Sequence, residues 1–271
     1  MDHNPVPPAA TTGLSPRRQQ LLADIQINPA ETRPLGGLNP YSPPFDTIGQ
    51  QFAKLLADHA GLTPSTKLLD LGCGTGRLTK PLQGTLTEGS YHGLDVHPRF
   101  LDFCRQTYTA PNFQFDHLDI RHDEYNPEGK IETTNARLPY ATNSFDLVAA
   151  VAVFNHFHTS WVFQYVREMG RVLKPRGVLF ATILLLNKQS MEFINTRKEP
   201  PYSFQHRTPE SWHDFRDRPL FNVAHPEEAI RRVFIKSNLM IREPISYGQW
   251  CRTQAGLTGP DVIFASKGGW R

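Results

Sequence analysis

Three alternate glycines after a short apolar segment constrain this chain more than any other feature. Residues 67–77 read KLLDLGCGTGR, with Gly72, Gly74 and Gly76 at every second position. The apolar residues before them predict a buried strand, and the segment from Leu78 predicts a helix. Glycine permits positive φ angles and a close approach of the backbone to a ligand, which the N–H groups at the helix start then face. The stretch therefore predicts a strand, a tight turn and a helix that bind a nucleotide-like molecule.

Two residues beside the glycines distinguish this loop from a dinucleotide-binding loop. Asp70 lies two residues before the first glycine, where its carboxylate would repel a pyrophosphate and suit an ammonium group. The dinucleotide fingerprint also requires a small residue at the position that Arg77 occupies. A ligand with a positive charge therefore fits the loop better than a dinucleotide.

An acidic residue ends the next predicted strand. The segment SYHGLDVHP predicts a strand that ends at Asp95, 21 residues after Gly74. A strand–turn–helix–strand unit needs this distance to bring an acidic side chain to a ribose.

The motif DLGCGTG, followed by Asp95, resembles the cofactor motif of class I methyltransferases that depend on S-adenosylmethionine (SAM). The resemblance implies that the glycine turn encloses the methionine part of SAM, that Asp95 holds the ribose hydroxyls, and that the product is S-adenosylhomocysteine (SAH). The cofactor-binding residues expected on this basis are Asp70, Gly72, Cys73, Gly74, Gly76, Arg77, Asp95, Val96, Asp119, Ile120 and Val153.

The third predicted strand, residues 113–118, is followed directly by Asp119 and Ile120. In the resembled family an acidic residue at this strand end contacts the adenine amino group, and an apolar neighbour packs against the ring. Asp119 and Ile120 match these positions.

The segment after this strand departs from the commonest family pattern, which places a Leu-Pro-Phe element within a few residues of the acid. Residues 121–137 are interposed here before Leu138-Pro139-Tyr140. They predict an inserted loop, and they leave Asn135 or Arg137 as alternative adenine contacts.

The fourth predicted strand is wholly apolar and ends at residues 154–157, which read FNHF. Such a run belongs in the middle of a parallel sheet, where the carboxyl ends of the strands bind ligands. Methyl transfer from SAM is an in-line displacement, so a base is needed only for an acceptor that arrives protonated, as an alcohol does. His156, just beyond the strand, is the candidate catalytic base. Capping of the strand and packing against the cofactor are the alternative roles.

Strands alternate with helices through most of the chain, and the turn RVLKPRGVLF resembles the RVLKPGG turn of the same family, with Arg176 in place of one glycine. The alternation predicts a Rossmann-like α/β fold. We expect a doubly wound, mostly parallel seven-stranded sheet with an antiparallel closing strand and helices on both faces. Besides the strands described above, the sequence predicts helices at 45–61, 100–108, 161–173 and 226–239, and strands at 178–186, 241–247 and 261–267.

Composition divides the chain into three parts. Residues 1–44 hold nine of the 23 prolines and predict an arm, with a lid at residues 39–41 as the sharper alternative. Residues 45–271 predict one methyltransferase domain. Within it, residues 187–225 are rich in aromatic residues and lack periodicity, and the family resemblance implies that they shape the substrate pocket.

Composition also bounds location and partners. The first residues contain no signal-peptide core and no stretch approaches a membrane span, so the cytoplasm is expected. The chain has 29 Lys and Arg residues against 26 Asp and Glu, and the basic residues are scattered along the sequence. This distribution neither requires nor excludes nucleic-acid binding. Cys73, Cys104 and Cys251 show no CxxC spacing, so no disulfide framework or metal site is indicated. The oligomeric state is open, with a homodimer as one option.

One absence bears on the methyl acceptor. Family members that methylate exocyclic amines of bases or glutamine amides carry an Asn/Asp-Pro-Pro-Tyr/Phe element after the fourth strand, where this chain has FNHF. The absence therefore favours an oxygen, nitrogen or carbon acceptor on a small molecule. Among these we expect methyl transfer to an oxygen of a natural product or sugar. The alternatives are an RNA or protein methyltransferase, a protein that binds SAM without turnover, and an enzyme of this fold that catalyses a cyclisation or rearrangement.

Overall fold

The computed structural model describes residues 43–197, 200, 202–209, 211–251 and 256–269. The predicted lid and nearly all of the predicted arm lie outside the described residues. None of the described helices combines the length and hydropathy needed to cross a bilayer.

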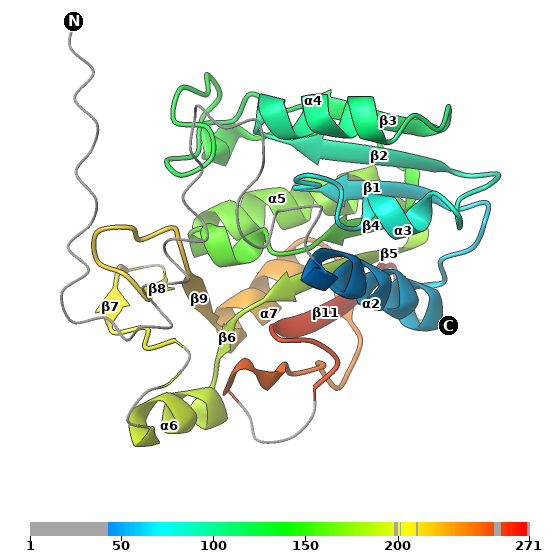
Figure 1. Cartoon of the computed structure of the whole chain (residues 1–271). Helices are drawn as coiled ribbons and strands as arrows, with labels where there is room; N and C mark the ends of the chain where they lie inside the picture. Colours follow the sequence, from blue (N-terminus) through cyan, green and yellow to red (C-terminus); the bar gives the residue numbers. More distant parts are fainter. Residues whose placement is uncertain (1–42, 198–199, 201, 210, 252–255, 270–271) are drawn as a thin grey trace, which may run out of the picture.

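A seven-stranded sheet forms the centre of the described chain (Figure 1). Its strands are β1 (Lys67–Leu71), β2 (Ser90–Asp95), β3 (Phe113–His117), β4 (Phe145–Ala150), β5 (Leu173–Ile183), β10 (Leu239–Ile241) and β11 (Asp261–Lys267). They lie in the order β10-β11-β5-β4-β1-β2-β3. β11 pairs antiparallel with β10 and β5, and the other neighbours pair in parallel. The predicted mostly parallel sheet with an antiparallel closing strand is confirmed.

Helices lie on both sides of this sheet (Figure 1). On one face are α2 (Pro43–Ala60), α3 (Thr79–Leu82) and α4 (Pro98–Thr107), and on the other are α5 (Thr159–Val172) and α7 (Glu227–Lys236). In β1, Leu68 packs in the core under α2, α3 and α4, and its neighbour Leu69 packs in the core under α5 and α7. Successive side chains of a strand point to opposite faces of the sheet. Both faces are covered, which is why most residues of β1 and β4 are apolar.

The predicted strand at 241–247 is wrong. The paired strand is β10, which ends at Ile241, and beyond it Ser246 forms only an isolated bridge with Val262 of β11. Pro244 explains the interruption, because proline has no N–H to donate to a neighbouring strand.

The described residues between β5 and α7 form a helix and a small sheet that the sequence pattern did not reveal. They contain α6 (Lys188–Thr196) and a four-stranded sheet in the order β6-β9-β8-β7. Its strands are β6 (Leu185–Leu186), β7 (His206–Arg207), β8 (Trp212–His213) and β9 (Val223–Pro226). Strands of two to four residues are too short for a detectable period. Because β6 follows β5 almost directly, this small sheet lies beyond the carboxyl end of the main sheet, at the left of Figure 1.

The irregular first part of β5 tests how backbone strain affects stability. Residues 174–177 are accommodated by a register shift between β4 and β5, and exposed Arg176 has φ +66°. A left-handed conformation costs a residue other than glycine about 1 to 2 kcal/mol. Glycine in turn lowers the free energy of unfolding by roughly 0.4 to 1 kcal/mol, because it gives the unfolded chain more conformational entropy. We expect Arg176→Gly to raise the free energy of unfolding by about 0.5 to 1 kcal/mol in urea denaturation.

Arg176→Ala is the matched control, since it removes the same side chain but keeps a Cβ at positive φ. It should give no gain. Equal stabilisation by both variants would show that the arginine side chain, and not the backbone angle, is the source.

Candidate functional site

A cavity of about 410 Å³ opens at the carboxyl ends of β1, β2 and β4. Its walls come from the glycine loop, the end of β2, the loop after β3, the segment after β4, and residues just before β7 and β9. Most of the lining is apolar or aromatic, which is typical of a small-molecule site. The aromatic lining residues are Phe52, Phe100, Tyr125, Phe157, Tyr165, Tyr202 and Phe221.

The glycine loop adopts the conformation that its spacing predicts. Gly72, Gly74 and Gly76 have φ angles of +70°, +54° and +87°. A Cβ on Gly72 would lie 2.5 Å from Cγ2 of Val153, and a Cβ on Gly76 would lie 2.2 Å from the Tyr108 ring. Gly72 therefore keeps backbone and side chains close at the cavity wall, whereas Gly76 makes room for a tyrosine that supports the loop from α4.

Asp95 joins the end of β2 to this loop. Its carboxylate accepts hydrogen bonds from the Gly74 N–H and the His97 N–H, each at 2.8 Å. Burial raises the pKa of the carboxyl, and these backbone donors act in the opposite direction. A carboxylate oxygen can accept more than one hydrogen bond, and Asp95 lines the cavity, so it can also accept from a ligand hydroxyl.

Asp70 is the second carboxylate of the cavity, and it is almost completely buried. The Tyr91 hydroxyl donates to it at 2.6 Å. Burial raises the pKa of Asp70 to about 7, and the charge of Asp95 adds to the effect. Among the described lining residues, Arg77 is the only lysine or arginine, and burial lowers its pKa. The acidic groups near the loop outnumber the cation, so this side favours a ligand with positive charge.

These features fit SAM. The glycine turn offers backbone at close range, Asp70 faces the space where an ammonium or sulfonium group is favoured, and Asp95 has lone pairs for ribose hydroxyls. Val96 and Ile120 add apolar surface suitable for a purine ring.

The cavity brings together most of the residues that the sequence singled out. Nine of the eleven predicted cofactor residues line it, and so does His156; Gly76 and Asp119 are not among the described lining residues. The Asp119 carboxylate instead lies 3.4 Å from the Asn126 side-chain nitrogen and 4.0 Å from Lys130 Nζ. The alternative adenine contacts, Asn135 and Arg137, are also absent from the described lining.

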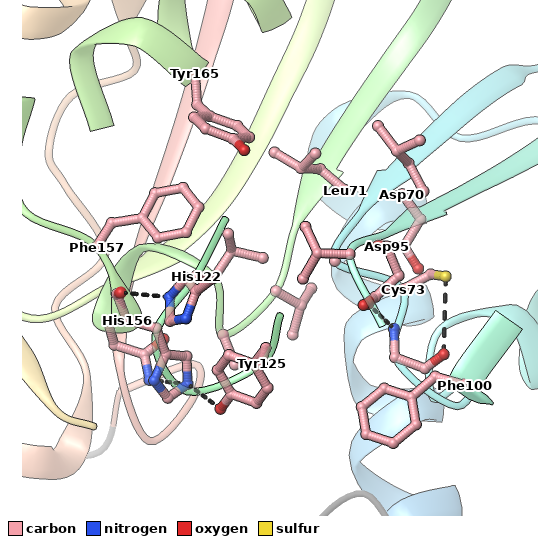
Figure 2. Close-up of a pocket in the computed structure, with 18 of the residues that line it drawn as sticks. Asp70, Leu71, Cys73, Asp95, Phe100, His122, Tyr125, His156, Phe157 and Tyr165 are labelled. Atoms are coloured by element: carbon pink, nitrogen blue, oxygen red, sulfur yellow. Dashed lines mark hydrogen bonds between the residues drawn. The ribbon is translucent and has the colours of Figure 1, made fainter. Parts of the chain in front are cut away.

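The side of the cavity opposite the glycine loop carries a neutral polar cluster (Figure 2). His156 Nδ1 lies 3.1 Å from the Leu220 carbonyl oxygen, which can only accept, so Nδ1 carries the proton and Nε2 is an acceptor. The Tyr125 hydroxyl and the Asn155 side-chain nitrogen each lie 3.2 Å from Nε2. Burial lowers the pKa of His156 to about 4, and His122 adds to the effect. The imidazole is therefore uncharged at neutral pH.

Tyr125 and His122 were not predicted as site residues. Both come from the loop after β3. Their only sequence clue was that this loop stands where the commonest family pattern has just a few residues between the acid and the Leu-Pro-Phe element. Tyr202, Phe221 and Asn222 reach the cavity from residues 187–225, the segment predicted to shape the substrate pocket.

Comparison with known proteins agrees with this geometry. A family model described as a methyltransferase domain matches residues 69–181. The chain is 31% identical over 137 residues to malonyl-[acyl-carrier protein] O-methyltransferase of Acetivibrio thermocellus, a match that covers 50% of this chain and 42% of the relative. It is 28% identical over 138 residues to a phthiotriol/phenolphthiotriol dimycocerosates methyltransferase of Mycobacterium leprae. This match covers 48% of this chain and 44% of the relative. The chain thus spans less than half the length of these curated relatives.

Solved structures share the fold. The PH0226 protein from Pyrococcus horikoshii OT3 has a TM-score of 0.58 at 16% identity, with 84% of this chain and 92% of that chain covered. A SAM-dependent methyltransferase from Aquifex aeolicus has a TM-score of 0.52 at 13% identity, with 83% and 94% covered. At such identities the likeness concerns the fold alone. The chain therefore shares its fold with a SAM-dependent methyltransferase, and its residues 69–181 match the model of a methyltransferase domain.

The raised pKa of Asp70 predicts a pH dependence of SAM binding. Below about pH 7 the carboxyl is protonated, and a cationic ligand favours its ionised form, so binding must release a proton. Affinity should therefore rise with pH between about pH 5.5 and 7, by at most about tenfold per unit for one linked proton. Calorimetry in buffers of different ionisation enthalpy measures both the affinity and the proton release.

Asp70→Asn is the control, because it keeps the size of the side chain and removes its titration. This variant should bind SAM more weakly near neutral pH and lose the pH slope. The same slope in both proteins would assign the titration to another group.

Proposed function

We propose that this protein transfers a methyl group from SAM to an oxygen of a small-molecule acceptor. The observation that carries the proposal is the division of one cavity. An acidic glycine-loop side suits the cationic cofactor, and an uncharged imidazole, His156, lies on the opposite side among aromatic residues (Figure 2).

The residues of the loop side have distinct roles in this proposal. Asp95 accepts hydrogen bonds from the ribose hydroxyls, and Val96 and Ile120 hold the adenine ring between apolar surfaces. Asp70 pairs with the ammonium group, and Arg77 with the carboxylate, of the methionine part. The chain positions both reactants and excludes water, which is the main catalytic task in an in-line displacement.

Bound SAM supplies the methyl group and the sulfonium leaving group. His156 takes up the proton that the acceptor hydroxyl loses. A weak base suffices for this step, because the acceptor oxygen becomes strongly acidic as its bond to the methyl carbon forms. The low pKa of His156 keeps the imidazole unprotonated and ready at neutral pH.

Two further observations support a small acceptor and an oxygen atom. The cavity volume of about 410 Å³ lies in the range of small-molecule sites. One relative is named as an O-methyltransferase, and the Mycobacterium leprae relative is named for phthiotriol compounds.

The full chain should bind SAM in calorimetry and release SAH with a member of a panel of hydroxyl compounds. Gly72→Ala should abolish SAM binding, because its Cβ would overlap Val153 and its φ is positive. Gly84→Ala is the matched control, since a Cβ there meets nothing within 4 Å, and it should bind SAM like the wild type.

The outcomes separate the alternatives. No SAM binding by the wild type would contradict the cofactor assignment. Binding without any methylated product across the panel would contradict methyl transfer and favour a protein that only binds SAM.

A further inference from the structure

The loop after β3 places Tyr125 in the cavity beside His156. The Tyr125 hydroxyl lies 3.2 Å from His156 Nε2, and the two rings meet edge to face with centroids 5.2 Å apart (Figure 2). Residues 121–137 are interposed where the commonest pattern of the resembled family has only a few residues, so the contact comes from this interposed loop.

Tyr125 is fixed from several directions. His122 and Asn126 bond to each other through both backbone N–H groups, at 2.9 and 2.8 Å, which closes the loop around Tyr125. The His122 ring lies 3.0 Å from the His156 carbonyl oxygen. Glu124, the neighbour of Tyr125, forms a part-buried ion pair with Arg218, which lies in residues 187–225. These contacts hold the tyrosine in place before any ligand binds.

The hydrogen-bond directions determine which atom an acceptor molecule can reach. His156 Nε2 has one lone pair, and both Tyr125 and Asn155 already donate toward it. A ligand hydroxyl therefore cannot bond to Nε2 without displacing one of them. The Tyr125 oxygen, in contrast, donates its own hydrogen to His156 and keeps its lone pairs for a ligand. Burial raises the pKa of Tyr125, so its hydroxyl stays protonated and remains a donor.

We propose that Tyr125 contacts the acceptor hydroxyl and relays its proton to His156. This inference rests on the proposed oxygen methylation. As the carbon–oxygen bond forms and the carbon–sulfur bond breaks, sulfur retains the electron pair. The acceptor hydroxyl gives its proton to the Tyr125 oxygen, and Tyr125 gives its own proton to His156 Nε2. The products are the methyl ether, neutral SAH and an imidazolium whose Nδ1–H still donates to the Leu220 carbonyl.

The side of the cavity that carries His156 and Tyr125 also indicates the class of acceptor. Its described lining consists of aromatic rings and uncharged polar groups, without a lysine, arginine or carboxylate on this side. Asn222 lines the cavity with 7% of its surface exposed, and its side-chain nitrogen has no hydrogen-bond partner among the described residues. A buried donor without a partner carries a free-energy penalty that a ligand oxygen would relieve. The acceptor is therefore a neutral hydroxyl compound with an apolar or aromatic body and a second oxygen that accepts from Asn222.

Tyr125→Phe tests the relay with little change of shape. With the hydroxyl compound that the wild type methylates, kcat should fall by about a hundredfold or more, with little change in KM for SAM. With 4-nitrophenol at a pH where it is ionised, no proton has to be removed, so kcat of wild type and variant should agree within a few-fold. Unchanged SAM affinity in calorimetry establishes that the variant is folded.

Tyr140→Phe is the matched control, because it removes a tyrosine hydroxyl that donates to Asp116 outside the cavity, and it should leave kcat unchanged. Asn222→Ala should raise KM for the hydroxyl compound roughly threefold to tenfold while kcat stays similar.

The results distinguish this inference from the proposed function. If the wild type methylates no hydroxyl compound, oxygen methylation and the relay both fail. If the wild type methylates a hydroxyl compound and Tyr125→Phe retains the wild-type kcat, only the relay is overturned. The same holds if the variant's kcat falls by the same factor with the hydroxyl compound and with ionised 4-nitrophenol. An unchanged KM in Asn222→Ala would remove Asn222 from the acceptor contact.

Discussion

The hydrogen bond from the Gly74 N–H to the Asp95 carboxylate ties the glycine loop to the end of the neighbouring strand. Two further bonds, from the Gly72 and Cys73 N–H groups to the Leu94 carbonyl at 2.7 and 3.2 Å, continue the attachment. The buried carboxylate is held by backbone donors in place of water, which offsets part of its desolvation. Without this connection the loop would have no defined position relative to β2, and the cavity would lose its cofactor wall.

The other support of the loop comes from α4. The Cys104 thiol lies 3.3 Å from the Gly74 carbonyl oxygen, and the Tyr108 hydroxyl donates to the Thr75 carbonyl at 3.0 Å. The loop is thus held by β2 on one side and by a helix on the other. A preformed loop spends little binding free energy on ordering itself around the cofactor.

The two sides of the cavity differ in charge for a chemical reason. The loop side has to stabilise a cationic sulfonium compound, and Asp70 and Asp95 provide negative charge. In the proposed reaction the opposite side takes up a proton, and burial keeps His156 neutral there beforehand. Residues 187–225 contribute to this second side through the Leu220 carbonyl and through Arg218, which pairs with Glu124 of the loop that carries Tyr125.

The sequence by itself determined the glycine loop, Asp95 and most of the central sheet, because these depend on glycine spacing and on apolar periodicity within short segments. It missed α6 and the small sheet, whose strands are too short to show a period, and it placed a strand across Pro244. Only the tertiary structure decided that Tyr125 meets His156, 31 residues away, and that Glu124 pairs with Arg218, 94 residues away. Such contacts form between segments whose own patterns contain no information about each other. The side of the cavity that carries Tyr125 and His156 is therefore defined only by the folded chain.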